Sequence, residues 1–268
     1  KKFKTNCRIY APVGPHKDLL AYLVRRLLEN GANSSFVNQI ADTNIPSVKI
    51  AACPFKQLAS GTAQKITSGP DIYGAGRVNS KGYDLNNAET LSALQNRLVI
   101  KAPLSVAPIL VSEAHRLSPH PIINPANADR LGTAQFCDAQ TAQQAIENGT
   151  PWHAQAAERQ RILLKAADLY EAEDGEALAL LMHEAGKTLA DAVGELREAV
   201  DFLRYYAAQI AHHQGTPRGI FTCISPWNFP LAIFTGQIAA ALAAGNGVLA
   251  KPAETTSAIA AWAITRLH

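Results

Sequence analysis

Residues 220–230 read IFTCISPWNFP. The run Ile220–Ile224 is short, apolar and rich in β-branched residues, and it predicts a buried strand. Ser225 and Pro226 end this strand. Pro230 stands where a proline is tolerated in the first turn of a helix. The stretch therefore predicts a strand that leads through a short turn into a helix.

The residues that follow predict a complete strand-helix-strand unit. Leu231–Ala244 has helix-forming composition, and Gly245–Gly247 ends it with residues that accept positive φ. Val248–Ala250 predicts a second short strand. So short a unit implies a parallel pair with a right-handed crossover. Both strands then finish at one edge of the sheet, where open α/β sheets bind their ligands.

Polar side chains follow both strands at this edge. We expect Asn228 and Lys251 to emerge side by side, which places an amide next to an ammonium group. Each residue also has an ordinary structural interpretation. Trp227 and Phe229 could be core aromatics, and asparagine is common in turns. The combination at this spacing nevertheless favours a functional site.

The motifs ISPWNFP (224–230) and KPAE (251–254) resemble those of the aldehyde dehydrogenase superfamily. The resemblance implies that Asn228 donates its side-chain amide to the oxyanion of a thiohemiacetal, where a fixed donor stabilises the developing charge. It implies that Lys251 and Glu254 hold the adenosine ribose hydroxyls. A carboxylate there favours NAD as cofactor, because it would repel a 2′-phosphate. The residues that would line the dinucleotide cleft are Ile224, Ser225, Pro226 and Trp227.

The cysteines predict neither a nucleophile nor a metal site. Cys223 stands beside the first motif, but it lies inside an apolar strand, and we reject it as the nucleophile. The resemblance implies that the nucleophilic cysteine and the general base lie beyond residue 268. Cys7, Cys53 and Cys137 show no CxxC spacing and no metal-ligand pattern.

A second resemblance lies near the start of the sequence. Residues 8–14 read RIYAPVG, and His16–Asn30 predicts a helix with leucines at helical spacing. Together they resemble the last strand and helix of the proline dehydrogenase barrel, in particular that of the bifunctional proline utilization A flavoenzymes.

This second resemblance implies a proline site and an FAD site. Arg25 and Arg26 would grip the proline carboxylate, since guanidinium groups stay charged and bind carboxylates bidentately. Tyr10 and Tyr22 would pack around the proline ring, and Glu29 would lie near FAD. Judged without the resemblance, the same helix is an ordinary amphipathic helix with two arginines on its solvated side.

The predicted fold class is α/β, in three parts. Residues 1–42 would form the last strand-helix unit of a (β/α)8 barrel. Residues 43–120, rich in Pro, Ser, Asn and Gly, would form an inter-domain linker with one helical stretch around Asn87–Ile100. Residues 121–268 would form the N-terminal portion of an aldehyde dehydrogenase-like, Rossmann-type NAD-binding domain. Its predicted elements are an opening strand at 122–126 and helices at 155–170, 174–185 and 188–212.

Two local features of this last part are expected to be structural. Glu184–Lys187 matches a loop of the aldehyde dehydrogenase superfamily. Thr188 with Asp191 predicts a capping box at the start of the helix 188–212. This helix carries a core stripe at helical spacing, made of Val193, Leu196, Val200 and Leu203.

Composition narrows the protein class. With 47% hydrophobic and 18% charged residues, the sequence is typical of a globular protein. A net charge of +3 is too small to argue for nucleic-acid binding. No run is long and apolar enough to span a bilayer, and we expect a cytoplasmic protein. Homo-oligomerisation is expected. DNA binding is expected only through regions outside this sequence, and peripheral membrane association of the parent protein is left open.

The two resemblances together imply a bifunctional enzyme. One half would oxidise proline to Δ1-pyrroline-5-carboxylate with FAD, and the other would oxidise glutamate semialdehyde to glutamate with NAD. Two alternatives stay open. The 268 residues could be a catalytically inert binding or assembly module, or part of a monofunctional aldehyde dehydrogenase, which the Arg25-Arg26 helix disfavours.

Overall fold

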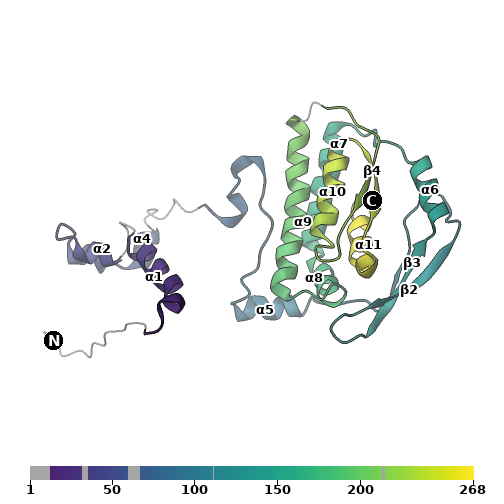
Figure 1. The fold of residues 1–268 in the computed structure, drawn as a ribbon. Helices are drawn as coiled ribbons and strands as arrows, with labels where there is room; N and C mark the ends of the chain where they lie inside the picture. Colours follow the sequence, from purple (N-terminus) through teal and green to yellow (C-terminus); the bar gives the residue numbers. More distant parts are fainter. Residues whose placement is uncertain (1–12, 32–35, 60–66, 111, 213–214) are drawn as a thin grey trace. The chain divides into compact units, whose positions relative to one another are not determined.

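The computed structural model describes residues 13–31, 36–59, 67–110, 112–212 and 215–268. The chain divides into two compact units, Lys1–Thr67 and Ser68–His268 (Figure 1). Each unit is described by itself. Tyr10 and the strand predicted around it lie outside the described residues.

The smaller unit is helical. Its helices are α1 (His16–Gly31), α2 (Phe36–Ala41), α3 (Ser47–Ile50) and α4 (Pro54–Ala59). Helix α1 confirms the helix predicted over His16–Asn30. Its leucines are poorly covered within this unit, since Leu20 is 52% and Leu27 is 72% exposed. Such an apolar face is typical of a helix that packs against further structure.

The larger unit is mixed α/β. Its chain begins with the 3-10 helices η1 (Gly69–Asp71) and η2 (Gly74–Gly76), then α5 (Ala88–Gln95). The next elements are β1 (Leu104–Val106), β2 (Leu117–Ile123), β3 (Arg130–Cys137), α6 (Ala139–Asn148), α7 (Ala156–Ala172), α8 (Asp174–His183), α9 (Leu189–Gln209) and η3 (Ile210–His212). The last are β4 (Ile220–Ile224), α10 (Ala232–Ala243), β5 (Gly247–Lys251), η4 (Glu254–Thr256) and α11 (Ser257–Thr265).

Helices α7, α9 and α10 lie side by side and form the centre of the core (Figure 1). All four residues of the predicted stripe on α9 are buried, among them Val200 and Leu203, which are 0% exposed. The start of α9 also follows the prediction, because the Thr188 hydroxyl accepts the backbone N–H of Asp191 at 3.2 Å. Local sequence therefore determines both where this helix begins and which face it buries.

The strand-helix-strand unit has the predicted topology. Strands β4 and β5 are parallel, with Ile220 opposite Gly247 and Ile224 opposite Lys251. Helix α10 connects them, and the chain leaves it through Gly245 at φ +82°. Pro230 precedes α10 by two residues, so it ends the turn instead of occupying the first helical position.

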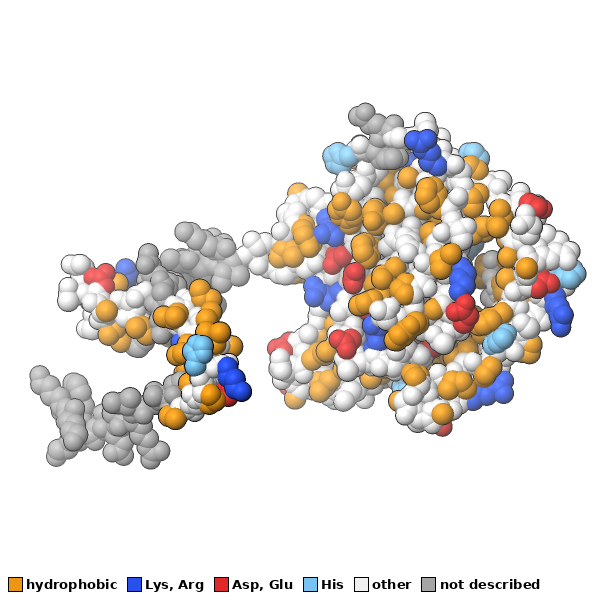
Figure 2. All heavy atoms as spheres, in the orientation of Figure 1, with side chains coloured by type: hydrophobic (Ala, Val, Ile, Leu, Met, Phe, Trp, Pro, Cys, Tyr) orange, Lys and Arg blue, Asp and Glu red, His pale blue; other side chains and the backbone are white. Residues whose placement is uncertain are grey.

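The prediction that β4 is buried is wrong. Only Cys223 is buried in this strand, whereas Phe221 is 43% and Ile224 is 63% exposed. The reason is that β4 has β5 as its single hydrogen-bonded neighbour within the described residues, and helices cover one of its faces. Figure 2 shows hydrophobic side chains gathered on the face of the larger unit where β4, α10 and α11 lie. The apolar composition of residues 220–224 correctly predicted a strand, but it did not predict that most of its side chains are not buried.

The larger unit contains a second sheet, of which the sequence predicted only one strand. It has the order β1-β3-β2, with β1 parallel and β2 antiparallel to β3. The expected opening strand at 122–126 corresponds to the end of β2, which begins earlier, at Leu117. Strand β2 contains Pro119 and Pro121, which an edge strand tolerates because proline cannot donate to a second neighbour.

The expected linker contains more structure than one helix. Besides α5, it holds α3, α4, η1, η2, β1 and the start of β2. Asn87 caps α5 by accepting the backbone N–H of Thr90 at 3.0 Å. The sequence predicted only one helical stretch here because the other elements are too short to show a clear hydrophobic period.

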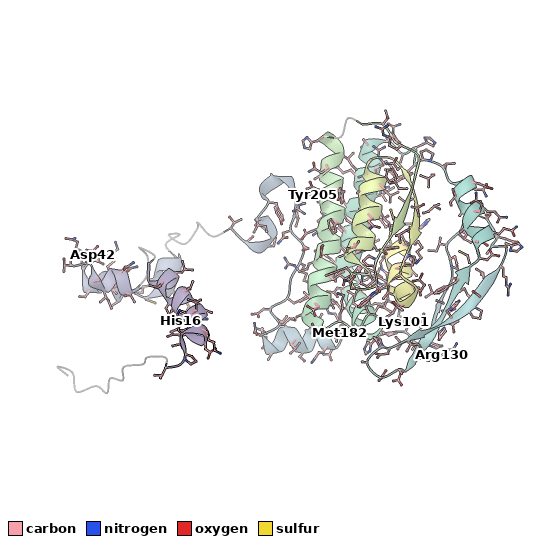
Figure 3. All side chains as sticks on the ribbon, in the orientation of Figure 1. His16, Asp42, Lys101, Arg130, Met182 and Tyr205 are labelled. Atoms are coloured by element: carbon pink, nitrogen blue, oxygen red, sulfur yellow. The ribbon has the colours of Figure 1, made fainter. Side chains whose placement is uncertain are left out.

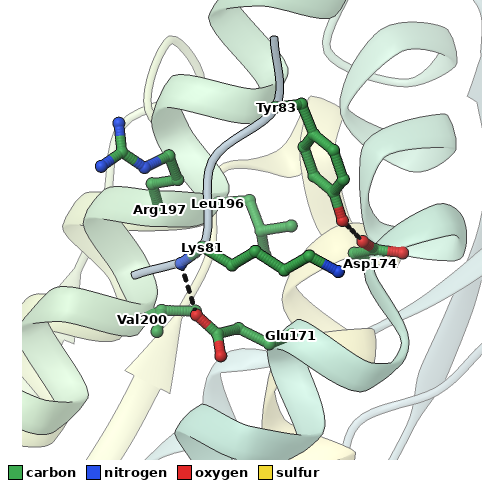
Figure 4. A pocket seen from close by; sticks show the side chains of 7 residues that line it. All are labelled: Lys81, Tyr83, Glu171, Asp174, Leu196, Arg197 and Val200. Atoms are coloured by element: carbon green, nitrogen blue, oxygen red, sulfur yellow. Dashed lines mark hydrogen bonds between the residues drawn. The ribbon is translucent and has the colours of Figure 1, made fainter. Parts of the chain in front are cut away.

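The later part of this segment is hydrogen-bonded to helices of the larger unit. Ser80 donates its hydroxyl to Asp201 at 2.7 Å, and the backbone N–H of Lys81 donates to Glu171 at 2.7 Å. Tyr83 donates to Asp174 (Figure 4). The cavity lined by Lys81, Tyr83, Glu171 and Asp174, among others, has a volume of about 10 Å³, which is room for about one water molecule. We therefore interpret this region as a structural junction.

Aromatic contacts extend the junction towards the end of α9. The Arg77 guanidinium lies 3.8 Å from the ring centroid of Tyr73 and 5.7 Å from that of Tyr205. Figure 3 labels Tyr205 on α9. Arg77 also donates to the carbonyl of Asp201 at 3.1 Å. A cation held over aromatic faces and hydrogen-bonded to a helix gives this contact a defined geometry.

Candidate active site

The candidate site lies at the carboxyl ends of β4 and β5. Beyond the last pair of the ladder, the backbone N–H of Ser225 donates to the carbonyl oxygen of Lys251 at 3.2 Å. The two motifs therefore leave the sheet from adjacent positions, as the sequence predicted. This edge is where open α/β sheets place their ligands.

Asn228 lies in the exposed turn between β4 and α10. Within the described residues, its side-chain amide has no hydrogen-bond partner, so both amide protons are available to a ligand. The neighbouring aromatics do not belong to the core, because Trp227 is 64% and Phe229 is 41% exposed. The interpretation of these two side chains as core aromatics is therefore wrong.

Lys251 and Glu254 form an ion pair at the end of β5. The ammonium nitrogen lies 2.5 Å from a carboxylate oxygen, and the two side chains are 49% and 66% exposed. The hydrogen bond from Lys251 lowers the pKa of Glu254, so this carboxylate stays ionised at neutral pH. Both groups keep further hydrogen-bonding capacity towards a ligand.

Ser225 adds a buried polar group to the same edge. Its side chain is 6% exposed, and its hydroxyl oxygen has no hydrogen-bond partner within the described residues. A buried hydroxyl without a partner costs free energy unless a ligand or water satisfies it. The edge thus presents an ammonium and a carboxylate, a pair that suits the hydroxyls of a sugar, beside the buried hydroxyl of Ser225.

The turn that carries Asn228 is held by a residue that sequence reasoning missed. Helix α10 has no cap from its own preceding side chain. Instead, the Glu195 carboxylate on α9 accepts the backbone N–H groups of Leu231 at 2.7 Å and Ala232 at 3.1 Å. Glu195 is 2% exposed. The available signal was a charged residue at helical spacing between Ala192 and Ala199, both of them buried.

This contact changes what the N-terminus of α10 can bind. In classical dinucleotide-binding units, the helix after the first strand receives the pyrophosphate on its free N–H groups. Here Glu195 already accepts two of these groups and places negative charge there. A phosphate at this helix end would meet a carboxylate, and the arrangement disfavours it.

The position of Cys223 agrees with its rejection as a nucleophile. Its side chain is 6% exposed, and burial raises the pKa of its thiol. A buried, protonated thiol is a poor nucleophile. Within the described residues, no group of three or more His, Cys, Asp or Glu side chains could hold a metal ion.

The predicted proline-site residues are only partly described. Tyr22 and Arg26 lie one turn apart on α1, and the Arg26 guanidinium is 5.4 Å from the Tyr22 ring centroid. Arg25 is exposed on the same helix. Glu29 belongs to α1, but its side chain lies outside the described residues, as does all of Tyr10. The structure thus brings together Tyr22 and Arg26.

Comparison with known proteins assigns a different family to each end of the chain. Residues 111–268 match the aldehyde dehydrogenase family, and residues 1–39 match the proline dehydrogenase family. The chain therefore belongs to the aldehyde dehydrogenase family, and it begins with a segment of proline dehydrogenase type.

The similarity to particular proteins is more specific. The chain is 48% identical to the bifunctional protein PutA of Escherichia coli (strain K12), over 99% of its own length and 22% of that protein. It is 38% identical to the crystal structure of PutA from Bradyrhizobium japonicum, with a TM-score of 0.69, over 97% of this chain and 26% of that one. It thus matches the junction region of PutA, as the two resemblances predicted.

A separate relative matches only the later part of the chain. The 1-pyrroline-5-carboxylate dehydrogenase 1 of Halalkalibacterium halodurans is 38% identical over 160 residues, which are 52% of this chain and 31% of that protein. The chain thus spans about a fifth to a third of the curated relatives it matches. No helix in the described part of the chain combines the length and the apolar character needed to cross a membrane.

Proposed function

We propose that this chain forms the junction of a bifunctional oxidoreductase of proline catabolism. The first half of that enzyme oxidises proline to Δ1-pyrroline-5-carboxylate. The second half oxidises glutamate semialdehyde, the hydrolysed form of this product, to glutamate. The observation that carries the proposal is the exposed pair of motifs at the ends of β4 and β5, in a chain whose residues 1–39 match proline dehydrogenase.

Asn228 is the catalytic residue of this proposal. When a thiolate attacks the aldehyde carbon, negative charge develops on the carbonyl oxygen. The unpartnered amide of Asn228 can donate to that oxygen, and a fixed donor of this kind contributes about 10²–10³-fold in kcat. Because the turn is exposed and the amide has no partner among the described residues, no hydrogen bond within that part of the chain has to break first.

Two side chains support NAD as the cofactor of this half. The Lys251 ammonium and the ionised Glu254 carboxylate fit the hydroxyls of an adenosine ribose, and Ser225 would line the dinucleotide cleft. The negative charge of Glu254 would repel the 2′-phosphate of NADP. Exposed Ile224, half-buried Pro226 and exposed Trp227 would line the cleft. When bound, NAD supplies the hydride acceptor for the oxidation of the aldehyde.

The proline half has narrower support. It rests on the match of residues 1–39 and on the contact between Tyr22 and Arg26. Arg25 and Arg26 would bind the proline carboxylate, and Tyr10 and Tyr22 would pack on the proline ring. Glu29 would lie near FAD, which supplies the electron acceptor for this half. A cytoplasmic location and a homo-oligomeric state belong to the same proposal.

The test uses the full-length protein that contains this sequence. We expect proline-dependent reduction of an artificial electron acceptor, and NADH formation from glutamate semialdehyde. If the first activity is missing, the protein is a monofunctional aldehyde dehydrogenase and the proposal is wrong. The 268-residue chain alone should form no NADH, because Cys223, the cysteine beside this edge, is buried and its burial raises the pKa of the thiol.

A further inference from the structure

We propose that Lys187 and Glu195 are positioning residues for Asn228. Their charges anchor the residue next to Asn228 and the start of α10 just beyond it, and thereby set the direction in which the amide points. The inference rests on the proposed role of Asn228 as the donor to the aldehyde oxygen. It concerns two side chains that come from a loop and a helix outside the strand-helix-strand unit.

The first anchor lies after Asn228. Glu195 on α9 accepts the backbone N–H groups of Leu231 and Ala232, three and four residues beyond the amide. Leu231 is 0% exposed, so packing fixes the same point from another direction. A carboxylate at a helix N-terminus is also favoured by the helix dipole. The end of the turn is therefore held by hydrogen bonds, charge and burial together.

The second anchor lies directly beside Asn228. The Lys187 ammonium is 2.8 Å from the Glu195 carboxylate and 4.6 Å from the centroid of the Phe229 ring. Gly186 precedes Lys187 and has a φ of +68°, a backbone conformation that residues other than glycine rarely adopt. The turn at Gly186 brings the Lys187 side chain to Glu195 and Phe229. One ammonium thus contacts both the aromatic next to Asn228 and the carboxylate that caps α10.

The pair explains how an exposed turn can hold a defined geometry. Asn228 has no side-chain partner of its own within the described residues, so the surrounding backbone determines where its amide points. The side chains of Lys187 and Glu195 are 13% and 1% exposed, which shields their interaction from solvent. Removing one partner would leave the other charge buried and unpaired. A donor of this kind acts only when it is held in place before the reaction.

The experiment removes the negative charge of the Glu195 side chain while keeping its size and shape. In the full-length enzyme, we expect Glu195→Gln to lower kcat/KM for glutamate semialdehyde by about 10–100-fold, less than the loss of the whole donor. The KM for NAD should stay within about threefold, since Lys251 and Glu254, the groups proposed to hold the adenosine ribose, lie on another turn. The melting temperature of each variant is measured alongside.

Glu184→Gln is the matched control. Glu184 is also a buried carboxylate that caps a helix, because it accepts the backbone N–H groups of Ala258 at 2.7 Å and Ile259 at 2.8 Å on α11. Within the described residues, Glu184 makes no hydrogen bond or ion pair with the turn that holds Asn228. We expect Glu184→Gln to leave kcat/KM for the aldehyde within about twofold. Equal losses in the two variants would show a general effect of stability and overturn the proposal.

A double variant separates positioning from a merely structural role. If Glu195 acts through Asn228, then Glu195→Gln should lower kcat/KM no further in an Asn228→Ala enzyme. Additive losses would overturn the positioning role. If Asn228→Ala alone changes nothing, the proposed function of Asn228 fails instead, and the two failures are thus distinguished.

Phe229→Leu decides the question if Glu195→Gln does not fold. Phe229 is 41% exposed and carries no charge, so shortening it leaves the ion pair between Lys187 and Glu195 in place. It removes the contact of the ring with Lys187. We expect a loss of about 3–10-fold in kcat/KM for the aldehyde, which again disappears in the Asn228→Ala background. An unchanged kcat/KM would contradict the proposal.

Discussion

Ser225 donates its backbone N–H to the carbonyl oxygen of Lys251 at 3.2 Å, one step beyond the last ladder pair of β4 and β5. This bond ties together two motifs that are 26 residues apart in the chain (251 − 225). It also sets how the two turns leave the sheet. The amide of Asn228 and the ion pair of Lys251 and Glu254 therefore belong to one edge.

Cofactor preference should depend on the charge of Glu254. We expect Glu254→Gln to raise the KM for NAD by about 3–10-fold and to lower the KM for NADP, because the variant removes both a ribose acceptor and a repulsive charge. Steady-state kinetics with both cofactors measures this. Glu89→Gln, at an exposed position on α5, is the control and should change neither KM. An unaltered ratio of the two KM values in Glu254→Gln would rule out this role.

Protein stability should depend on pH through Glu184. Burial raises the pKa of this carboxyl from 4.5 to about 7, although the N–H groups of Ala258 and Ile259 act in the opposite direction. The raised pKa means that the folded protein favours the protonated form. The resulting stabilisation is complete below about pH 4.5 and is lost as pH rises through about 7.

Between pH 5 and pH 8, we expect this group to lower the free energy of unfolding by roughly 2–3 kcal/mol. Glu184→Gln should remove this fall. Urea-induced unfolding of both proteins at the two pH values measures the difference. A pH dependence that stays the same in the variant would show that Glu184 does not titrate in this way.

Arg204 should be important for stability. It is 7% exposed, and its guanidinium donates to both oxygens of Glu171, at 3.0 and 2.8 Å, and to Asp168 at 3.1 Å. Lysine cannot reproduce this fork, so Arg204→Lys should cost about 1–3 kcal/mol, and Arg204→Met about 3–5 kcal/mol, because it leaves the Glu171 carboxylate without its guanidinium partner. Denaturant unfolding measures both.

The control for Arg204 is an ion pair on the surface. Arg161 pairs with Glu158 at 2.6 Å, but the two side chains are 65% and 46% exposed. Solvent screens such pairs, and Arg161→Lys should leave the unfolding midpoint unchanged. If Arg204→Lys also left the unfolding midpoint unchanged, the bidentate contact between Arg204 and Glu171 would not contribute to stability.

The segment around Ser80 should be released when Asp201 is removed. Asp201 accepts the Ser80 backbone N–H at 3.1 Å and its hydroxyl at 2.7 Å, and it pairs with Arg77 at 3.5 Å. We expect Asp201→Ala to increase tryptic cleavage after Arg77 and Lys81 by about tenfold, because local opening exposes the backbone. Asp84→Ala is the control. In the part of the chain that the structure describes, its carboxylate accepts only the nearby N–H of Asn86. Equal cleavage rates in the two variants would argue against the anchor.

Local sequence predicted the parts of the fold that depend on short-range patterns. The predictions of the strand-helix-strand unit and of the cap at Thr188 were confirmed, since both features follow from periodicity and turn chemistry within a few residues. The role of Glu195 was missed because its partners lie 36 and 37 residues away. Likewise, the sheet β1-β3-β2 depends on pairing between separate segments, and its strand β2 contains two prolines.

Exposure was the hardest property to predict. Ile224 and Phe221 are apolar and sit in a strand, yet both are exposed, since burial depends on which elements cover the sheet. The free hydroxyl of Ser225 is likewise visible only in three dimensions. For Arg25 and Arg26, the sequence pattern alone favours a solvated helix face, and only the resemblance pointed to a substrate site.

The most direct test of the account is Asn228→Ala in the full-length protein. We predict that NADH formation from glutamate semialdehyde falls by about 10²–10³-fold, because the donor to the developing oxyanion is lost. Proline-dependent reduction of an artificial electron acceptor by the same preparation should be unchanged, which shows that the enzyme is folded. NADH formation within about twofold of the wild-type rate would contradict the account.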